Sequence, residues 1–214
     1  MKKILQLFLL LPLFVFSQKT HETVLAKAVD YHDPENEWET LKTTLNFTEM
    51  RPSGDDRFAV VTLDNTRGYM KINRNDENIY EVLEDSCTVL AGDQNVAQGV
   101  KIRNYYLYLW GLPMKLNDEG TPFDRELSEE SVNGQKCDVL RVAYEKDTWY
   151  FYVSQQTGRM LQYKFYQDDE ETKGELILLE DEIKVGNMRI PQKRSWYTLP
   201  EMKFLGTDIL TSSN

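Results

Sequence analysis

The sequence predicts an α+β fold that is mainly β, in which a curved antiparallel sheet, an incomplete barrel, wraps two amphipathic helices. Most of the chain consists of short segments whose apolar and polar residues alternate, as in strands with one buried face. Short turns join these segments, so the strands must be antiparallel, because a parallel crossover needs a dozen or more residues. Two other segments have the period of a helix.

The first amphipathic helix is expected from Thr20 to His32, where Val24, Ala28 and Tyr31 share one face. Thr20 can cap its start, and Asp33-Pro34 ends it. His32 is then expected to meet the last carbonyl groups of this helix and the negative end of its dipole. The helix must bury its apolar stripe against another element.

A first group of strands follows this helix. The segment from Glu39 to Met50 alternates Leu41, Thr43, Leu45 and Phe47 with polar residues, which indicates a half-buried strand. A turn at residues 51–56 contains proline and glycine. Further strands are predicted at residues 58–63, 69–73, 79–83 and 87–90.

The second helix is predicted from Val96 to Trp110, where Ile102, Tyr106 and Leu109 share a face. Gly111 stands where a left-handed C-terminal cap is expected, and Pro113 prevents continuation of the helix. The two helices are expected to fill the concave face of the sheet, because a sheet of so many strands twists and curls.

A second group of strands follows, and its centre is the hairpin from Thr148 to Tyr166. Trp149, Phe151 and Val153 are expected on one face of its first strand, with two tyrosines on the other face. Strands are also predicted at residues 125–132, 135–144, 173–181 and 188–198, with turns at 133–134 and 186–187.

The N-terminus has the pattern of a secretory signal peptide. Two lysines precede an apolar run from Ile4 to Phe16, and small residues near Ser17 suit a signal peptidase. We expect cleavage after Ser17, a single domain at residues 18–214, and a periplasmic or secreted protein without a membrane span. The apolar run is shorter than the ~20 residues that a spanning helix needs.

Composition excludes several classes of function. The net charge of −10 argues against nucleic acid, whose phosphates require a basic face. Common catalytic motifs are missing, and the two histidines, His21 and His32, have no partners at metal-ligand spacing. The sequence therefore predicts no metal site, no cofactor and no catalytic residue, that is, no enzyme.

The two cysteines, Cys87 and Cys137, leave two alternatives open. An exported chain enters an oxidising compartment, where a disulfide between them would contribute roughly 4 kcal/mol on the chain-entropy model. Alternatively, each is a separate buried thiol that packs as a small apolar side chain. Their separation in the sequence does not place them within bridging distance.

Large apolar side chains gather around the end of the second helix and on strands that could face it. They are candidate ligand-binding residues, because such groups can line an apolar cavity, although they also dominate ordinary protein cores. The candidates are Tyr105, Tyr106, Trp110, Leu112, Met114, Trp149, Phe151 and Trp196.

Several runs of the chain together resemble an uncharacterised family of exported bacterial proteins with a lipoprotein-carrier-like fold. These runs are Tyr31-His32-Asp33-Pro34 with Trp38, Asn104-Tyr105-Tyr106, Gly111-Leu112-Pro113-Met114-Lys115-Leu116, Asp147 to Tyr152, Gly174-Glu175 and Leu205-Gly206-Thr207-Asp208. The resemblance implies a half-barrel whose relatives bind acyl chains or other hydrophobic ligands without covalent chemistry. It assigns no functional residue.

These observations predict an exported protein that binds a hydrophobic small molecule, a lipid or the acyl part of a lipoprotein, in a cavity between sheet and helices, without catalysis. The alternative is a structural or protein-interaction module of the cell envelope whose core is filled. The two hypotheses differ in whether side chains occupy the space between the second helix and the sheet.

Overall fold

The computed structural model describes residues 19–84, 86–93 and 95–213, so the predicted signal peptide lies outside the described residues. The helical elements are α1 (His21–His32), α2 (Val96–Asn104), 3-10 turns at Trp38–Thr40, Asn65–Arg67 and Met114–Asn117, and a π-helical turn at Tyr105–Leu109. The strands are β1 (Lys42–Met50), β2 (Arg57–Asp64), β3 (Tyr69–Arg74), β4 (Asn78–Leu83), β5 (Ser86–Ala91), β6 (Ser128–Val132), β7 (Gln135–Ala143), β8 (Thr148–Ser154), β9 (Met160–Tyr166), β10 (Gly174–Glu180), β11 (Ile183–Val185), β12 (Met188–Ile190), β13 (Lys193–Leu199) and β14 (Phe204–Ser213).

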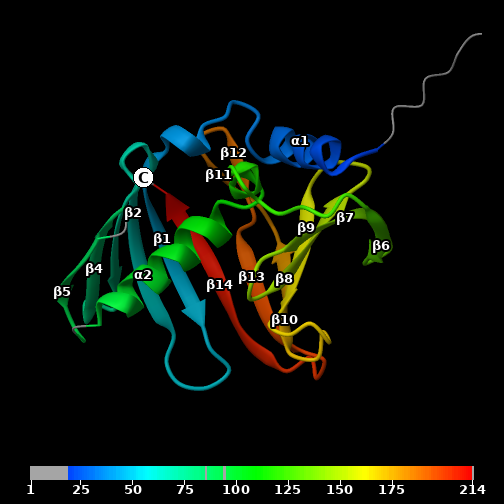
Figure 1. Ribbon diagram of the computed structural model, residues 1–214. Helices are drawn as coiled ribbons and strands as arrows, with labels where there is room; N and C mark the ends of the chain where they lie inside the picture. Colours follow the sequence, from blue (N-terminus) through cyan, green and yellow to red (C-terminus); the bar gives the residue numbers. More distant parts are fainter. Residues whose placement is uncertain (1–18, 85, 94, 214) are drawn as a thin grey trace, which may run out of the picture.

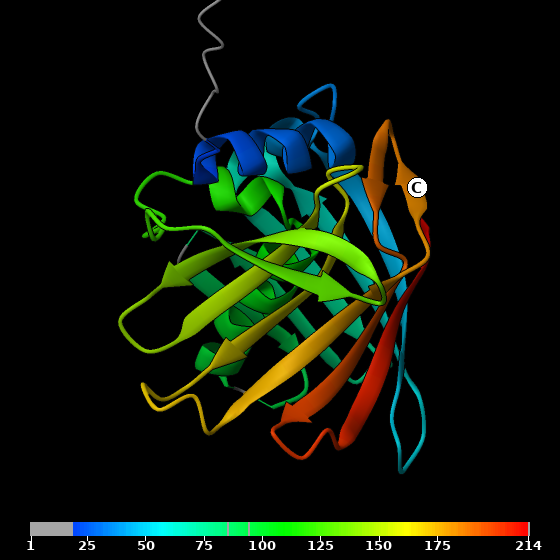
Figure 2. The same ribbon diagram turned by 90° about the vertical axis from the view of Figure 1, so that its right-hand side faces the viewer.

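Twelve of these strands form one antiparallel sheet in the order β5-β4-β3-β2-β1-β14-β13-β10-β9-β8-β7-β6. The sheet curls strongly, but its edge strands β5 and β6 do not pair, so the barrel stays open. α2 lies against the concave face, and α1 lies across one end of the curved sheet (Figures 1 and 2). The predicted curved antiparallel sheet with two helices is confirmed.

The core has two main parts on the concave side. One part lies between α2 and strands β1 to β4, and the other lies between α1 and strands β7 to β10. Tyr105 packs against both parts, because it stands where the chain leaves α2 and passes over the middle of the sheet. No helix in the described part of the chain is long and apolar enough to cross a membrane.

The hairpin of β8 and β9 has the two-sided character that its sequence predicts. Phe151 and Val153 are buried on the concave side. Tyr152 is buried on the opposite face, where it packs with Cys137 and Val139 of β7. Alternation along one strand therefore places large side chains in two different clusters.

The sequence pattern does not predict β14, although this strand lies at the middle of the sheet. It pairs with β1 on one side and β13 on the other, and so joins the two groups of strands. Its buried positions include Gly206, Asp208 and Leu210. Because a glycine and a carboxylate occupy two of these positions, the segment lacks the apolar alternation that indicates a half-buried strand.

The expected single strand at residues 188–198 is wrong. Pro191 separates β12 from β13, and β12 pairs with β11 in a small hairpin outside the main sheet. The predicted turn at Gly186 and Asn187 closes this hairpin, where Glu37 accepts hydrogen bonds from the backbone and side chain of Asn187. In the main sheet β10 pairs with β9 on one side and with β13 on the other.

The second helix is shorter than predicted, because its regular part ends at Asn104 and continues as the π-helical turn. The left-handed cap expected at Gly111 is wrong, since Gly111 has no positive φ. Its lack of a side chain has another reason: an added Cβ would collide with the Trp38 ring and lie 2.7 Å from the carbonyl oxygen of Leu107. Gly111 thus permits a close approach between the helix end and Trp38.

The variant Gly111→Ala is expected to lower the free energy of unfolding by about 2 kcal/mol, because the added methyl group overpacks a buried contact. Urea unfolding checks this value. The change Trp38→Phe removes the ring atom that the methyl group meets, so the double variant should recover part of the loss. An unchanged urea midpoint for Gly111→Ala would contradict the proposed close packing.

His32 does not contact the last carbonyl groups of α1, as the sequence had suggested. Its ring is fully buried, with Nδ1 2.6 Å from the carbonyl oxygen of Arg189, while Nε2 accepts a hydrogen bond of 3.0 Å from the backbone N–H of Met160. His32 therefore links α1 to β12 and to β9. The pKa of His32 is lowered to about 4, mainly by burial and also by the nearby arginines.

Both cysteines are free thiols, which decides between the two alternatives left open by the sequence. Cys87 lies on the edge strand β5, and Cys137 lies on β7, near the opposite edge of the sheet. The sheet order holds these strands apart, so no bridge joins the two residues. Burial raises the pKa of both thiols.

Candidate functional site

A pocket of about 500 Å³ lies between α2 and the concave face of the sheet. One face of α2 and of the π-helical turn forms its roof, with side chains at helical spacing: Gln98, Lys101, Ile102, Tyr105 and Leu109. The remaining wall comes from residues of eight sheet strands, from Arg51 in the β1–β2 turn and from Gln167 just after β9. Its volume falls within the range of ~300–1,000 Å³ that is usual for small-molecule sites.

Three of the eight predicted ligand-binding residues line this pocket, namely Tyr105, Trp149 and Trp196. Phe165 adds a further ring, stacked on Trp149 with a centroid distance of 4.4 Å. These rings make an apolar wall on the side of β8, β9 and β13. Such a wall can accept an alkyl chain or another apolar group.

The other five predicted residues do not line the pocket but are buried in the core: Tyr106, Trp110, Leu112, Met114 and Phe151. Tyr106 and Trp110 pack on Phe47 of β1. Trp110 also lies under the guanidinium of the fully buried Arg194, 4.0 Å from the ring centroid. These aromatic groups belong to the protein's own packing.

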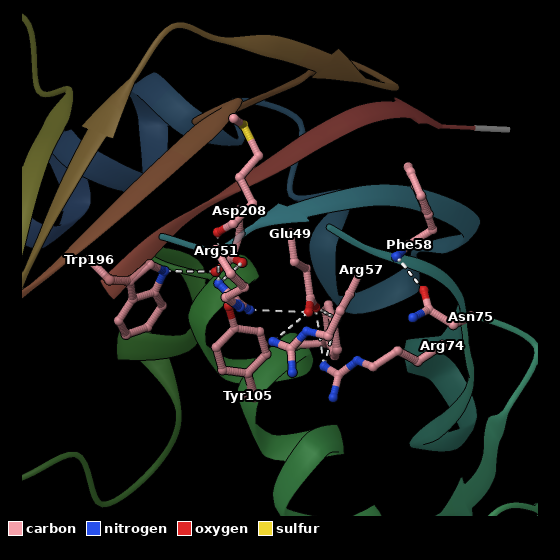
Figure 3. A network of polar contacts seen from close by, with 11 residues as sticks. Glu49, Arg51, Arg57, Phe58, Arg74, Asn75, Tyr105, Trp196 and Asp208 are labelled. Atoms are coloured by element: carbon pink, nitrogen blue, oxygen red, sulfur yellow. Dashed lines mark hydrogen bonds and ion pairs between the residues drawn. The ribbon is translucent and has the colours of Figure 1, made fainter. Parts of the chain in front are cut away.

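The opposite end of the pocket is polar, and its centre is Glu49 at the end of β1. Only 1% of this side chain is exposed. It forms ion pairs with Arg51, Arg57 and Arg74, at 3.2, 2.8 and 3.1 Å (Figure 3). Tyr106 donates a hydrogen bond to the same carboxylate. One buried carboxylate therefore holds three guanidinium groups at the pocket wall.

A second buried carboxylate, Asp208 of β14, lies directly opposite Glu49 in the register of β1 and β14. It accepts hydrogen bonds from Tyr105 and from Nε1 of Trp196, and Arg51 lies 3.2 Å away between the two acids (Figure 3). Burial raises the pKa of Asp208, although its hydrogen bonds and Arg51 act in the opposite direction. Arg51 thus joins the two carboxylates and offsets their repulsion.

The residues of this polar end are not among the eight predicted ligand-binding residues, although the strand patterns contain them. On β1 the buried positions run through Leu45 and Phe47 to Glu49, and on β2 the same face ends at Arg57. Arg74 takes the equivalent place on β3. Charged residues rarely occupy the apolar face of a strand unless they are paired, so these positions carried a usable signal.

The described residues contain no group of three or more histidine, cysteine or acidic side chains that could hold a metal ion. The pocket instead combines aromatic side chains at one end with hydrogen-bonded charges at the other. This arrangement can bind a ligand by burying its apolar part and pairing its polar part.

Comparison with solved structures shows the fold. A domain from Vibrio parahaemolyticus, described as an outer membrane lipoprotein-sorting protein, is similar with a TM-score of 0.53 and 10% identity, over 90% of this chain and 92% of that chain. A LolA-superfamily protein from Nitrosomonas europaea has a TM-score of 0.49 and 12% identity, over 92% and 94% of the two chains. A DUF1329 family protein from Desulfovibrio piger has a TM-score of 0.48 and 12% identity, over 90% and 92%.

The lipoprotein-carrier-like fold expected from the sequence is therefore confirmed. This conclusion rests on the structural similarity to the Vibrio parahaemolyticus domain. No curated protein matches the sequence. Residues 95–212, from the start of α2 to the end of β14, match a family of unknown function. Since this match spans more than half of the chain, the protein belongs to the family of unknown function DUF6503.

Proposed function

We propose that this protein is exported and binds a hydrophobic ligand, a lipid or the acyl chain of a lipoprotein, in the pocket under α2, without catalysis. The observation that carries the proposal is the aromatic wall of Trp149, Phe165 and Trp196, which lines an open volume of about 500 Å³. The N-terminal pattern of a signal peptide supports export.

The energetics of the pocket favour a ligand with an alkyl chain. Each methylene group that leaves water for an apolar wall contributes roughly 0.8 kcal/mol, so a chain of several methylene groups can be held in the micromolar range. The pocket is also largely formed without the ligand, because α2 is packed against β4 and β5. Pre-organisation of this kind reduces the entropy lost on binding.

Native mass spectrometry of the protein purified from its own cells, with extraction of bound lipids, tests the proposal. A stoichiometric apolar adduct is expected. Titration with a fluorescent fatty acid then measures the dissociation constant of the emptied protein. A protein that carries no adduct and takes up no apolar probe would overturn the proposal, and a filled interaction module would replace it.

The variant Trp149→Ala is expected to weaken binding of the fluorescent fatty acid about tenfold, because the loss of an aromatic wall removes roughly 1.4 kcal/mol of contact free energy. Phe58→Ala is the matched control, since Phe58 is an aromatic residue on the opposite face of β2, 60% exposed and outside the pocket. Circular dichroism establishes that both variants fold. Wild-type affinity in folded Trp149→Ala would contradict this site.

A further inference from the structure

The polar end of the pocket carries an excess of positive charge in a protein that is acidic as a whole. Four cationic residues line the pocket, Arg51, Arg57, Arg74 and Lys101, against the three acids Glu49, Asp208 and Glu175. The complete chain has a net charge of −10. The pocket is therefore a local exception to the charge of the whole molecule, and this excess favours an anion.

The charges and the aromatic rings are separated along the sheet. Arg74, Arg57 and Glu49 come from β3, β2 and β1, on one side of the central strand β14. Trp196 and the rings of β9 and β8 come from the other side. The arginines thus lie on one side of β14 and the aromatic rings on the other, where Glu175 of β10 is the acid among the rings. A ligand that spans the pocket meets the arginines at one end and the rings at the other.

The arginines also keep donors free for a ligand. Among the described residues, Arg57 has Glu49 as its one ionic partner, reached by Nη2, and Arg74 uses Nη2 for both Glu49 and Tyr106. Nε of each arginine is buried without a hydrogen-bond partner. The side chains are 39% and 17% exposed, so both remain accessible from the pocket. Two adjacent guanidinium groups with unused N–H donors suit a carboxylate or a phosphate.

The acids at this site do not cancel the attraction for an anion. Glu49 is already engaged by three arginines and Tyr106, and Asp208 by Arg51, Tyr105 and Trp196. Glu175 lies across the pocket, on β10 beside Phe165, and burial raises its pKa. Because both carboxylates are already paired, the partly exposed guanidinium groups of Arg57 and Arg74, which line the pocket, can pair with an added anion.

We propose that the ligand of this pocket is an anionic amphiphile, whose carboxylate or phosphate head group is bound by Arg57 and Arg74 while its alkyl chain lies against Trp149, Phe165 and Trp196. This inference rests on the proposed function, because it assigns the head group of the same hydrophobic ligand. A long-chain fatty acid and an alkyl phosphate are the simplest molecules of this class.

The test compares four probes of the wild-type protein: hexadecanoate, hexadecyl phosphate, hexadecanol and inorganic phosphate. Hexadecanoate and hexadecyl phosphate are expected to displace a neutral fluorescent lipid probe at concentrations at least tenfold lower than hexadecanol, which has the same chain without the charge. Inorganic phosphate is expected to bind far more weakly than hexadecyl phosphate, because it lacks the chain.

The double variant Arg57→Gln and Arg74→Gln is expected to lose at least tenfold in affinity for the two anionic lipids and to keep the affinity for hexadecanol. The matched control is Arg67→Gln, an exposed arginine in the 3-10 turn before β3 that lies outside the pocket. Should the double variant not fold, the head-group comparison on the wild-type protein still decides the inference.

The outcomes separate this inference from the proposed function. Equal binding of hexadecanol and hexadecanoate by the wild-type protein, or full retention of anion affinity in the folded double variant, would overturn the head-group assignment and leave the hydrophobic pocket standing. Tight binding of inorganic phosphate without uptake of any lipid would keep the anion site and overturn the proposed function. Binding of none of the four probes would overturn both.

Discussion

Replacing Glu49 by glutamine is expected to lower the free energy of unfolding by about 3 kcal/mol, because three arginines then lose their shared counter-ion. The side chain is almost completely buried, and a glutamine offers only one acceptor oxygen to the surrounding donors. Removing one partner of a buried ion pair usually costs about 3–5 kcal/mol, and the loss here is expected at the lower end because the arginines are partly exposed and water can solvate them. Urea unfolding at neutral pH gives the value.

Asp208→Asn is the matched control for this prediction. Asp208 lies opposite Glu49 and is equally buried, but the oxygen of an asparagine can still accept the hydrogen bonds from Tyr105 and Trp196. The change also removes the repulsion between two adjacent carboxylates. We expect a loss of about 1 kcal/mol or less. Equal losses of unfolding free energy in the two variants would contradict the prediction that Glu49 is the shared counter-ion of the three arginines.

Lowering the pH from 6.5 to 4 is expected to remove about 3 kcal/mol of stability through His32 alone. The folded-state pKa of about 4 lies below the ordinary value of 6.5, so the folded chain excludes a proton that the unfolded chain binds in this window. The contribution of His32 is therefore fully present above pH 6.5 and disappears as the pH falls. The cause is burial, reinforced by Arg159, Arg194 and Arg189.

The variant His32→Gln isolates this effect. An amide can donate to the carbonyl of Arg189 and accept from the N–H of Met160, as the ring does, but it does not titrate. Urea unfolding between pH 7 and pH 4.5 should therefore show a flatter dependence on pH in the variant than in the wild type. His21→Gln, a change of the partly buried histidine at the start of α1, is the matched control for removal of an imidazole. Parallel curves for wild type and His32→Gln would contradict the prediction.

The amino-acid sequence determines most of the local structure of this protein. The alternation in β1 and β2, the turn at Asn133 and Gly134 and the apolar face of α1 follow from short-range rules of side-chain direction and backbone conformation. The two-sided hairpin of β8 and β9 follows in the same way. These features need only neighbouring residues, so a pattern within one segment is enough to predict them.

The tertiary structure decided which aromatic residues face the pocket and which fill the core. Tyr105 and Tyr106 are neighbours in the sequence, yet Tyr105 lines the pocket and Tyr106 packs beneath it on Phe47. Sequence composition alone does not separate the two roles, because both require a large apolar surface. The separation depends on how the π-helical turn after α2 is oriented against the sheet.

Only the assembled sheet brings Glu49 of β1, Arg74 of β3 and Asp208 of β14 to one place. β14 is distant in the sequence from β1, and its central position depends on pairing with two strands from different groups. A glycine and a buried aspartate hide its strand pattern, because Gly206 has no side chain to bury and Asp208 is held by hydrogen bonds and not by apolar contacts. The sequence alone thus determined most of the strands, the approximate places of the two helices and the curled antiparallel sheet, whereas long-range pairing placed β14 and decided where charge and aromatic surface meet.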